Sequence, residues 1–191
     1  MVDNGGMTDR LVLRRWRAGD LDALAALNAD PEVMRYILDG RTRTRQESAE
    51  ALDRMIRHWD EHGFGLFAVE LKETGEFAGW AGLAIPAFLP EVLPAVEIGW
   101  RLARRFWGSG YATEAATEAM RFGFEDVGLD RIISIRHVGN VRSARVMEKL
   151  GLRHAFDTVV PGVGQPVAVH ERSRQKTDAV RGGSRAGSAH E

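Results

Sequence analysis

The chain has 191 residues, 44% of them hydrophobic, which predicts one domain whose core needs no disulfide to stabilise it. The formal net charge is −1, so no global basic field exists to attract nucleic acid. No cysteine is present, which excludes a disulfide scaffold, a cysteine-based zinc site and a cysteinyl acyl-enzyme. No apolar run approaches the ~20 residues of a membrane span, and the start lacks an apolar signal-peptide core. We therefore expect a cytoplasmic protein that binds neither membrane nor nucleic acid.

The first half of the chain alternates between periods typical of strands and of helices. Thr44 and Glu47 form a predicted capping box, and Gly63 ends the amphipathic helix that follows them. The expected elements are a strand at 11–13, helices at 21–27, 31–37 and 45–62, and strands at 64–71 and 76–85.

Two features of this half allow more than one interpretation. The segment Arg41–Arg45 carries three arginines, which either attract an acidic substrate or belong to a solvated loop, and charge runs are usually solvated. The run His58–His62 matches the His-x-x-Glu-His pattern of inverted zinc proteases. Because Gly63 ends the helix at once and no later acidic residue is marked as a third ligand, we favour solvated histidines and predict no metal site.

Residues 97–120 organise the chain as a strand, a basic glycine turn and a helix. Residues 96–102 alternate with a period of two, and small residues recur on one side of the later helix. Between them, Gly108 and Gly110 lack a Cβ, so a ligand can approach the backbone N–H groups that open the helix. Arg104 and Arg105 add positive charge, so the stretch predicts a phosphate site.

The loop differs from the commoner phosphate-binding motifs. A Walker loop requires Lys and then Ser or Thr after its second glycine, where Tyr111 and Ala112 stand. The dinucleotide fingerprint needs three glycines, and only part of its spacing is present. The remaining match is Arg-x-x-Gly-x-Gly, formed by Arg105, Gly108 and Gly110.

The second half predicts a parallel strand pair joined by the helix after the glycine turn. A loop at 86–95 precedes the central strand, and strand, helix and strand at this spacing form a right-handed βαβ unit. Asn140 is the expected cap of the next helix. The remaining expected elements are a helix to about 127, a strand at 131–137, a helix at 141–150, strands at 152–160 and 166–171, and a disordered tail at 173–191.

The residues from Arg105 to Ala115 resemble the coenzyme A pyrophosphate loop of the GNAT N-acetyltransferase superfamily. Residues 140–152 resemble its Asn-x-x-Ser-x-Arg signature, followed by Gly151 and Leu152. The chain start through Arg35 is similar to the branch typified by ribosomal-protein alanine acetyltransferases. The resemblance covers residues 8–172 and leaves a flexible start at 1–7. It implies an α/β GNAT-like fold with a mixed, mostly antiparallel central sheet, splayed at the parallel βαβ unit and flanked by helices.

The resemblance also implies the site residues and acetyl transfer from acetyl-CoA to an amine. Trp100, Arg101 and Leu102 would supply backbone groups to the pantetheine arm, and Asn140 would hold its side or cap its helix. The pyrophosphate would be held by Arg105, Phe106, Trp107, Gly108, Ser109, Gly110, Tyr111 and Ala112.

The chemistry needs a neutral amine, and Glu97 is the candidate general base, acting through water, although a salt-bridged strand carboxylate is the alternative. A backbone N–H at residues 100–102 is expected to stabilise the oxyanion. Ser143 occupies the family position that assists the leaving thiolate, with Tyr111 as the weaker alternative. Without cysteine, direct transfer in a ternary complex is favoured over a ping-pong route.

The predicted function is therefore an N-acetyltransferase acting on a primary amine, either a protein N-terminus or a small molecule. The alternative from another class is a non-catalytic acyl-CoA-binding or sensor domain of the same fold. The acceptor cannot be read from the sequence, and a homodimer is left open.

Overall fold

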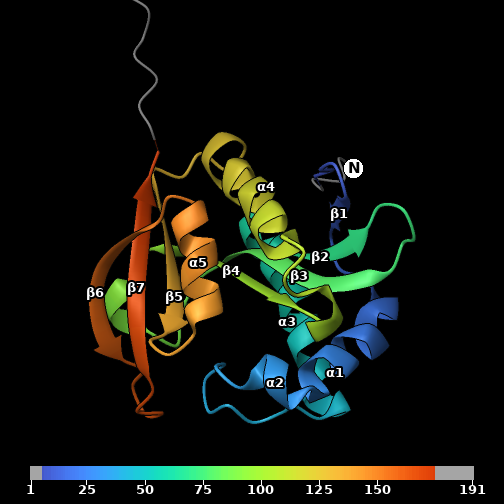
Figure 1. Ribbon diagram of the computed structural model, residues 1–191, viewed down its shortest axis with the longest axis horizontal. Helices are drawn as coiled ribbons and strands as arrows, with labels where there is room; N and C mark the ends of the chain where they lie inside the picture. Colours follow the sequence, from blue (N-terminus) through green and yellow to red (C-terminus); the bar gives the residue numbers. More distant parts are fainter. Residues whose placement is uncertain (1–5, 175–191) are drawn as a thin grey trace, which may run out of the picture.

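The computed structural model describes residues 6–174, which form one seven-stranded sheet flanked by helices (Figure 1). Most of the predicted tail and of the predicted flexible start lie outside these residues, but the tail was predicted to begin too early, because Ser173 pairs with Arg131 as the last residue of a strand. Along the chain, the main elements are β1 (Leu11–Arg14), α1 (Leu21–Ala29), α2 (Pro31–Met34), α3 (Arg45–His62), β2 (Leu66–Leu71), β3 (Phe77–Ala84), β4 (Val96–Leu102), α4 (Tyr111–Glu125), β5 (Arg131–His137), α5 (Val141–Lys149), β6 (Arg153–Val159) and β7 (Pro166–Ser173).

The strand order is β1-β2-β3-β4-β5-β7-β6, and only β4 and β5 run parallel. The other neighbours are antiparallel, which confirms the predicted mixed sheet. The parallel pair is joined through α4, as the βαβ spacing predicted. In Figure 1, β4 and β5 diverge from one another, so the sheet opens at its only parallel pair within residues 6–174.

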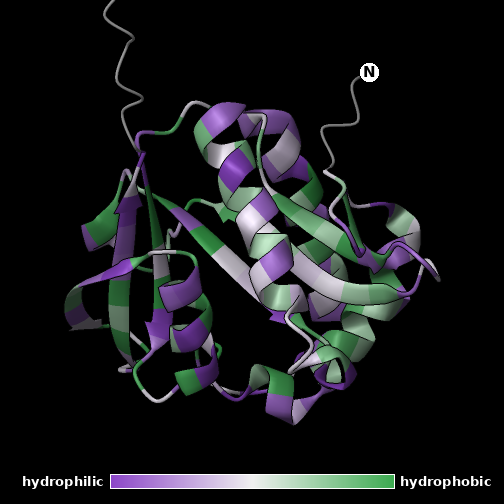
Figure 2. Cartoon of the chain, turned by 45° about the horizontal axis from the view of Figure 1, so that its top comes forward, coloured by the Kyte–Doolittle hydropathy of each residue, from purple (hydrophilic) through white to green (hydrophobic). Residues whose placement is uncertain are grey.

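Helices cover both faces of the sheet and enclose separate parts of the core. On one face α4 packs against β3 and β4, where Ala115, Ala116 and Ala119 are fully buried. A Cβ at Gly123 would stand 2.8 Å from Ile132 Cδ1, so the small residues let α4 lie close to the sheet. On the other face α1 and α3 enclose Trp80 in a second cluster. Figure 2 shows hydrophilic bands alternating with hydrophobic ones along α4 and α5.

Local signals explain most element boundaries. Thr44 Oγ1 accepts the Glu47 N–H at 3.2 Å and a Glu47 carboxylate oxygen accepts the Thr44 N–H at 2.8 Å, so the predicted capping box is confirmed. Gly63 ends α3 at a φ of 72°. The predicted helix at 31–37 is too long, because α2 ends at Met34 and the chain turns. Within residues 6–174 no helix is long and apolar enough to cross a membrane.

Candidate active site

The parallel ladder between β4 and β5 stops after two residue pairs. Val96 pairs with Ile132 and Glu97 with Ile133. Ser134, a buried residue that no sequence motif marks, then donates its hydroxyl hydrogen to the Ile98 carbonyl at 2.8 Å. Beyond that bond β5 continues to pair with β7 on its other side. The strands therefore separate immediately after Ile98.

The separation leaves backbone groups of β4 facing the opening. The Ile98 carbonyl faces β5, so the period of two turns the backbone of Trp100 and Leu102 in the same direction. The Leu102 carbonyl accepts a hydrogen bond from Trp107 Nε1 at 2.8 Å. The Arg101 backbone lies opposite Trp80 of β3 instead. Of the three predicted backbone ligands, two face the opening and Arg101 faces the neighbouring strand.

Glu97 extends its carboxyl group into this opening. The N–H of Ile135, on β5, donates to Glu97 Oε1 at 3.4 Å. Burial raises the pKa of Glu97 to about 8, against which the single long hydrogen bond has a smaller lowering effect. A carboxyl group with this pKa exchanges protons near neutral pH, as a general base requires.

The glycine turn exposes the amino-terminal end of α4. Gly108 and Gly110 have φ values of 81° and 85°, which favour glycine at both positions. Gly110 is the N-cap of α4 and offers no side-chain hydrogen bond. The first helical bond is donated by Glu114, so the preceding N–H groups are available to an anion.

A partner that the sequence analysis missed holds this turn in place. Arg10 donates from Nη1 to the Ser109 carbonyl at 3.0 Å, and its guanidinium lies 4.4 Å from the centre of the Tyr111 ring. The Arg10 side chain also pairs with Glu114 at 2.6 Å, and Thr8 bonds the same carboxylate. No local pattern could have linked residues about one hundred positions apart.

The two arginines expected to charge the turn already have acidic partners. Arg104 lies 3.7 Å from Asp30, and Arg105 lies 2.7 Å from Glu76. Both arginine side chains are more than half exposed, so solvent weakens these pairs and an incoming anion can compete for them. Phe106 is buried beneath the turn.

The second predicted motif forms the first turn of α5. Asn140 Oδ1 accepts the Ser143 N–H at 3.1 Å, so its predicted capping role is confirmed. α5 contacts both α4 and β5, which places the helix that carries Ser143 on the β5 side of the opening. Arg142 approaches the loop, with its guanidinium 4.6 Å from the Trp107 ring centre.

The histidines of the zinc-like pattern lie apart from this site, at the end of α3. The rings of His58 and His62 are 4.5 Å apart and both lie against Phe64. His58 is partly buried and its Nε2 is enclosed without a hydrogen-bond partner within residues 6–174, so the prediction of a solvated histidine is wrong here. Burial and the neighbouring His62 lower the pKa of His58. Residues 6–174 contain no group of three or more His, Cys, Asp or Glu side chains placed to hold a metal ion.

Comparison with known proteins shows to which protein family the chain with this glycine turn belongs. A family profile described as the acetyltransferase (GNAT) domain matches residues 10–153. The chain belongs to the GNAT acetyltransferase family. The GNAT match spans β1 to α5 and includes the opening, the glycine turn and the Asn140 motif, so the predicted family is confirmed.

Individual GNAT proteins resemble the chain over most of its length. The FsC-acetyl coenzyme A-N(2)-transacetylase of Aspergillus fumigatus is 34% identical over 166 residues, which cover 78% of this chain and 68% of that protein. A crystal structure of an acetyltransferase from Agrobacterium tumefaciens has a TM-score of 0.76 at 25% identity, over 89% of this chain and 94% of the other. The structure of RimL, a ribosomal L7/L12 α-N-protein acetyltransferase in complex with coenzyme A, shares the fold with a TM-score of 0.72 at 18% identity, over 88% and 96% of the two chains.

Proposed function

We propose that this GNAT protein transfers the acetyl group of acetyl-CoA to a primary amine by direct attack in a ternary complex. The observation that carries the proposal is the opening between β4 and β5. It holds the Glu97 carboxyl group at one end, and β4 leads from it to the uncapped start of α4. A thioester carrier and a base can therefore meet at one place.

The donor would lie along β4. The Trp100 backbone and the Leu102 N–H would bond the pantetheine arm, and the N–H groups of residues 108–112 would bind the pyrophosphate. Asn140 would keep its cap and border the arm. Support comes from the RimL structure, which contains coenzyme A in the same fold, and from the A. fumigatus relative, whose name includes acetyl coenzyme A.

The acceptor nitrogen must lose a proton before or during attack. Glu97 would take that proton through water, and its pKa of about 8 lies close to the ~7.7–8.0 of an α-amino group. The nitrogen then bonds to the thioester carbon, and a β4 N–H group stabilises the oxyanion. When the C–S bond breaks, the Ser143 hydroxyl donates a hydrogen bond to the thiolate, whose conjugate acid is already a moderate one.

The donor site is tested by Gly108→Val. A Cβ at this position would meet no protein atom within 4 Å, so within the protein the change strains only the backbone, at φ 81°. The valine side chain would fill the space in which we expect the phosphate to bind. We expect coenzyme A affinity to fall at least about 10-fold, measured by calorimetry. Gly162→Val, also at positive φ in open space but distant in sequence from the turn, is the matched control and should keep the affinity.

The chemistry is tested by an amine panel with acetyl-CoA, following thiol release against pH. Activity should rise with pH through about 8, as the Glu97 carboxyl group ionises. Glu97→Gln should lower kcat about 10²- to 10⁴-fold and remove the part of this pH dependence that Glu97 causes. Coenzyme A binding without acetylation of any amine would instead identify the non-catalytic acyl-CoA-binding domain. The cytoplasmic location stays a prediction.

A further inference from the structure

Arg101 is a largely enclosed cation that forms no ion pair within residues 6–174. Its Nη1 donates to Asn28 Oδ1 at 2.6 Å, and its guanidinium lies 4.9 Å from the centre of the Trp80 ring. Its Nε is enclosed without a hydrogen-bond partner. Burial and the positive charge of Arg43 lower the pKa of Arg101 to about 10, and no described carboxylate acts against them. The guanidinium is still charged at neutral pH, and no side chain in the described part of the chain supplies a compensating anion.

The groups around Arg101 are fixed in an orientation that suits an anion. Asn28 is 3% exposed, and its Nδ2 donates to Ser48 Oγ at 3.2 Å, which turns the amide oxygen towards Arg101. The backbone N–H of Arg43 donates to the backbone carbonyl of Asn28 at 2.9 Å, which joins the basic loop before α3 to the end of α1. Arg101 itself stays partly exposed, so a ligand can reach it.

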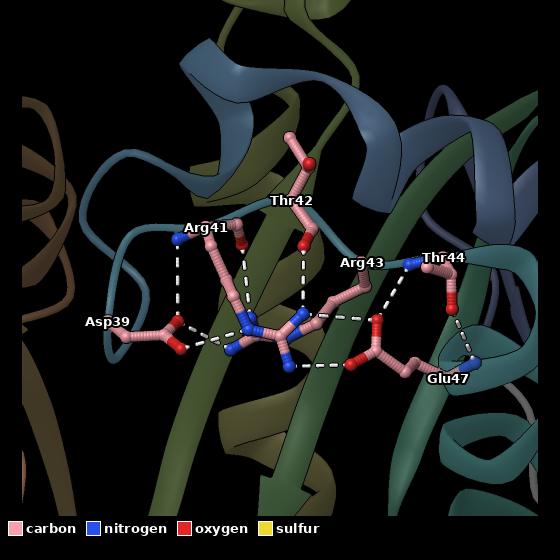
Figure 3. A network of polar contacts seen from close by, with 6 residues as sticks. All are labelled: Asp39, Arg41, Thr42, Arg43, Thr44 and Glu47. Carbon is pink, nitrogen blue, oxygen red and sulfur yellow. Dashed lines mark hydrogen bonds and ion pairs between the residues drawn. The ribbon is translucent and has the colours of Figure 1, made fainter.

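The basic loop before α3 is not the source of this free charge. Figure 3 shows the loop closed by its own polar contacts, with Arg41 between two carboxylates. Every arginine from 41 to 45 has an acidic partner: Arg41 pairs with Asp39 and Glu47, Arg43 with Asp39, and Arg45 with Asp22. Of the two interpretations of the loop, these pairs and the exposure of Arg41 and Arg45 favour the solvated loop, and the unmatched charge is that of Arg101 on β4.

Arg101 shares a sheet face with the proposed base. Glu97 and Arg101 are four residues apart on β4, so their side chains leave the same face and their Cα atoms are about 13 Å apart. Gly99 stands between them and faces Gly82 of β3, so neither of these two positions adds a side chain to the path. A Cβ at Gly99 would rest 3.5 Å from the Trp80 ring, which forms the floor beside it.

We propose that Arg101 binds a carboxylate of the acceptor, so that the preferred substrates are amines with an acidic group several bonds from the reacting nitrogen. The proposal rests on the function proposed above, because it places that nitrogen beside Glu97. The N–H groups of the Arg101 guanidinium would bind the carboxylate, while the Trp80 ring stacks on the plane of the guanidinium. An α-amino acid is too short to reach from Glu97 to Arg101.

The test compares matched acceptors that differ only in charge. The probes are 6-aminohexanoate and 6-aminohexanamide, and the shorter pair 3-aminopropanoate and 3-aminopropanamide, each with acetyl-CoA at fixed pH. We expect kcat/KM to favour the longer acid over its amide by about 10- to 100-fold, the effect of a charged hydrogen bond, with a smaller ratio for the short pair. Arg101→Gln should bring the ratio close to one, and Arg101→Lys should leave an intermediate value.

The control is Arg45→Gln, which removes an exposed arginine from the neighbouring loop and should keep the ratio. Circular dichroism and a thermal melt establish that each variant is folded. Equal use of acid and amide by the unaltered protein would overturn the carboxylate site and leave the acetyltransferase proposal standing. A preference that survives Arg101→Gln would also overturn it. Acetylation of no amine would reject both proposals, so the two failures are distinguishable.

Discussion

Two enclosed arginines of the same sheet have opposite surroundings. Arg14, on β1, is 6% exposed and bonds both oxygens of Asp20 at 2.7 and 2.8 Å, together with the carboxylate of Glu70. These hydrogen bonds raise the pKa of Arg14 despite its burial. Arg101, on β4, has one neutral amide and an aromatic ring, and burial lowers its pKa.

The difference separates an arginine that holds the fold together from one that is ready for a ligand. The partners of Arg14 come from the next strand and from the turn before α1, so the ion pairs fasten three segments to one another. The surroundings of Arg101 orient the guanidinium but leave its charge unmatched. An enclosed arginine without an acidic partner therefore indicates a binding site, whereas an enclosed arginine in an ion pair indicates a contribution to stability.

The largest expected effect is on stability. Arg14→Met should lower the free energy of unfolding by about 3–5 kcal/mol, because it leaves Asp20 and Glu70 as unpaired carboxylates. Arg101→Met should lower it by less, about 1–3 kcal/mol, since only the amide oxygen of Asn28 loses a partner. Urea denaturation of both variants at pH 7 measures the difference. Similar losses in the two variants would remove the distinction between the arginines.

A second prediction concerns the change in stability with pH that the ionisation of Glu97 causes. The pKa of Glu97 is raised from its unfolded value near 4.3 to about 8, so ionisation destabilises the fold as pH rises between these values. Asp20 acts in the opposite direction: hydrogen bonds from Arg14 and Arg17 outweigh burial and lower its pKa, so its contribution is lost only in acid.

Between pH 5 and 8 the unaltered protein should lose stability relative to Glu97→Gln by on the order of 3 kcal/mol, since one pKa unit is worth about 1.4 kcal/mol. Thermal melts of both proteins across this range provide the measurement. Parallel curves would show that Glu97 ionises as freely in the folded protein as in water.

The smallest expected effect comes from a substitution that gives Arg101 an acidic partner, as Arg14 has. Asn28→Asp places a carboxylate where the amide oxygen now lies, 2.6 Å from Arg101 Nη1. The new ion pair should raise the free energy of unfolding by about 1 kcal/mol and compete with an acidic acceptor, which lowers the acid-to-amide ratio about 10-fold. Gln46→Glu, which changes an exposed amide of α3 to a carboxylate, is the control for the charge change, and its ratio should not fall. An unchanged ratio in Asn28→Asp would show that acceptors do not use Arg101.

The order of elements and the glycine turn could be predicted because local periodicity and capping determine them. The strands β2 and β3, the parallel pair, the capping box at Thr44 and the cap at Asn140 all lie where the local sequence predicted them. Where prediction failed, at the end of α2, no glycine or proline marks the boundary, and the chain turns through hydrogen bonds from the Ile37 N–H to the Met34 carbonyl and from the Gly40 N–H to the Ile37 carbonyl.

The charge balance of the site could not be predicted, because it depends on partners distant in sequence. Asn28 and Arg101 are 73 positions apart, and the pairing of Arg105 with Glu76 joins a loop to a strand start. The sequence shows which arginines exist but not which have a partner. The basic loop illustrates this limit, since its charges are balanced by acids that the local pattern did not emphasise.

The carboxylate of Glu114 also has a practical consequence. It receives hydrogen bonds from Thr8 and Arg10, and Arg10 in turn holds the carbonyl of Ser109. Anything fused ahead of Thr8 is thus tethered within a few residues of the proposed pyrophosphate turn. A truncation that begins after Arg10 would therefore disturb the turn itself, and assays of coenzyme affinity are better made on a protein that keeps Thr8 and Arg10.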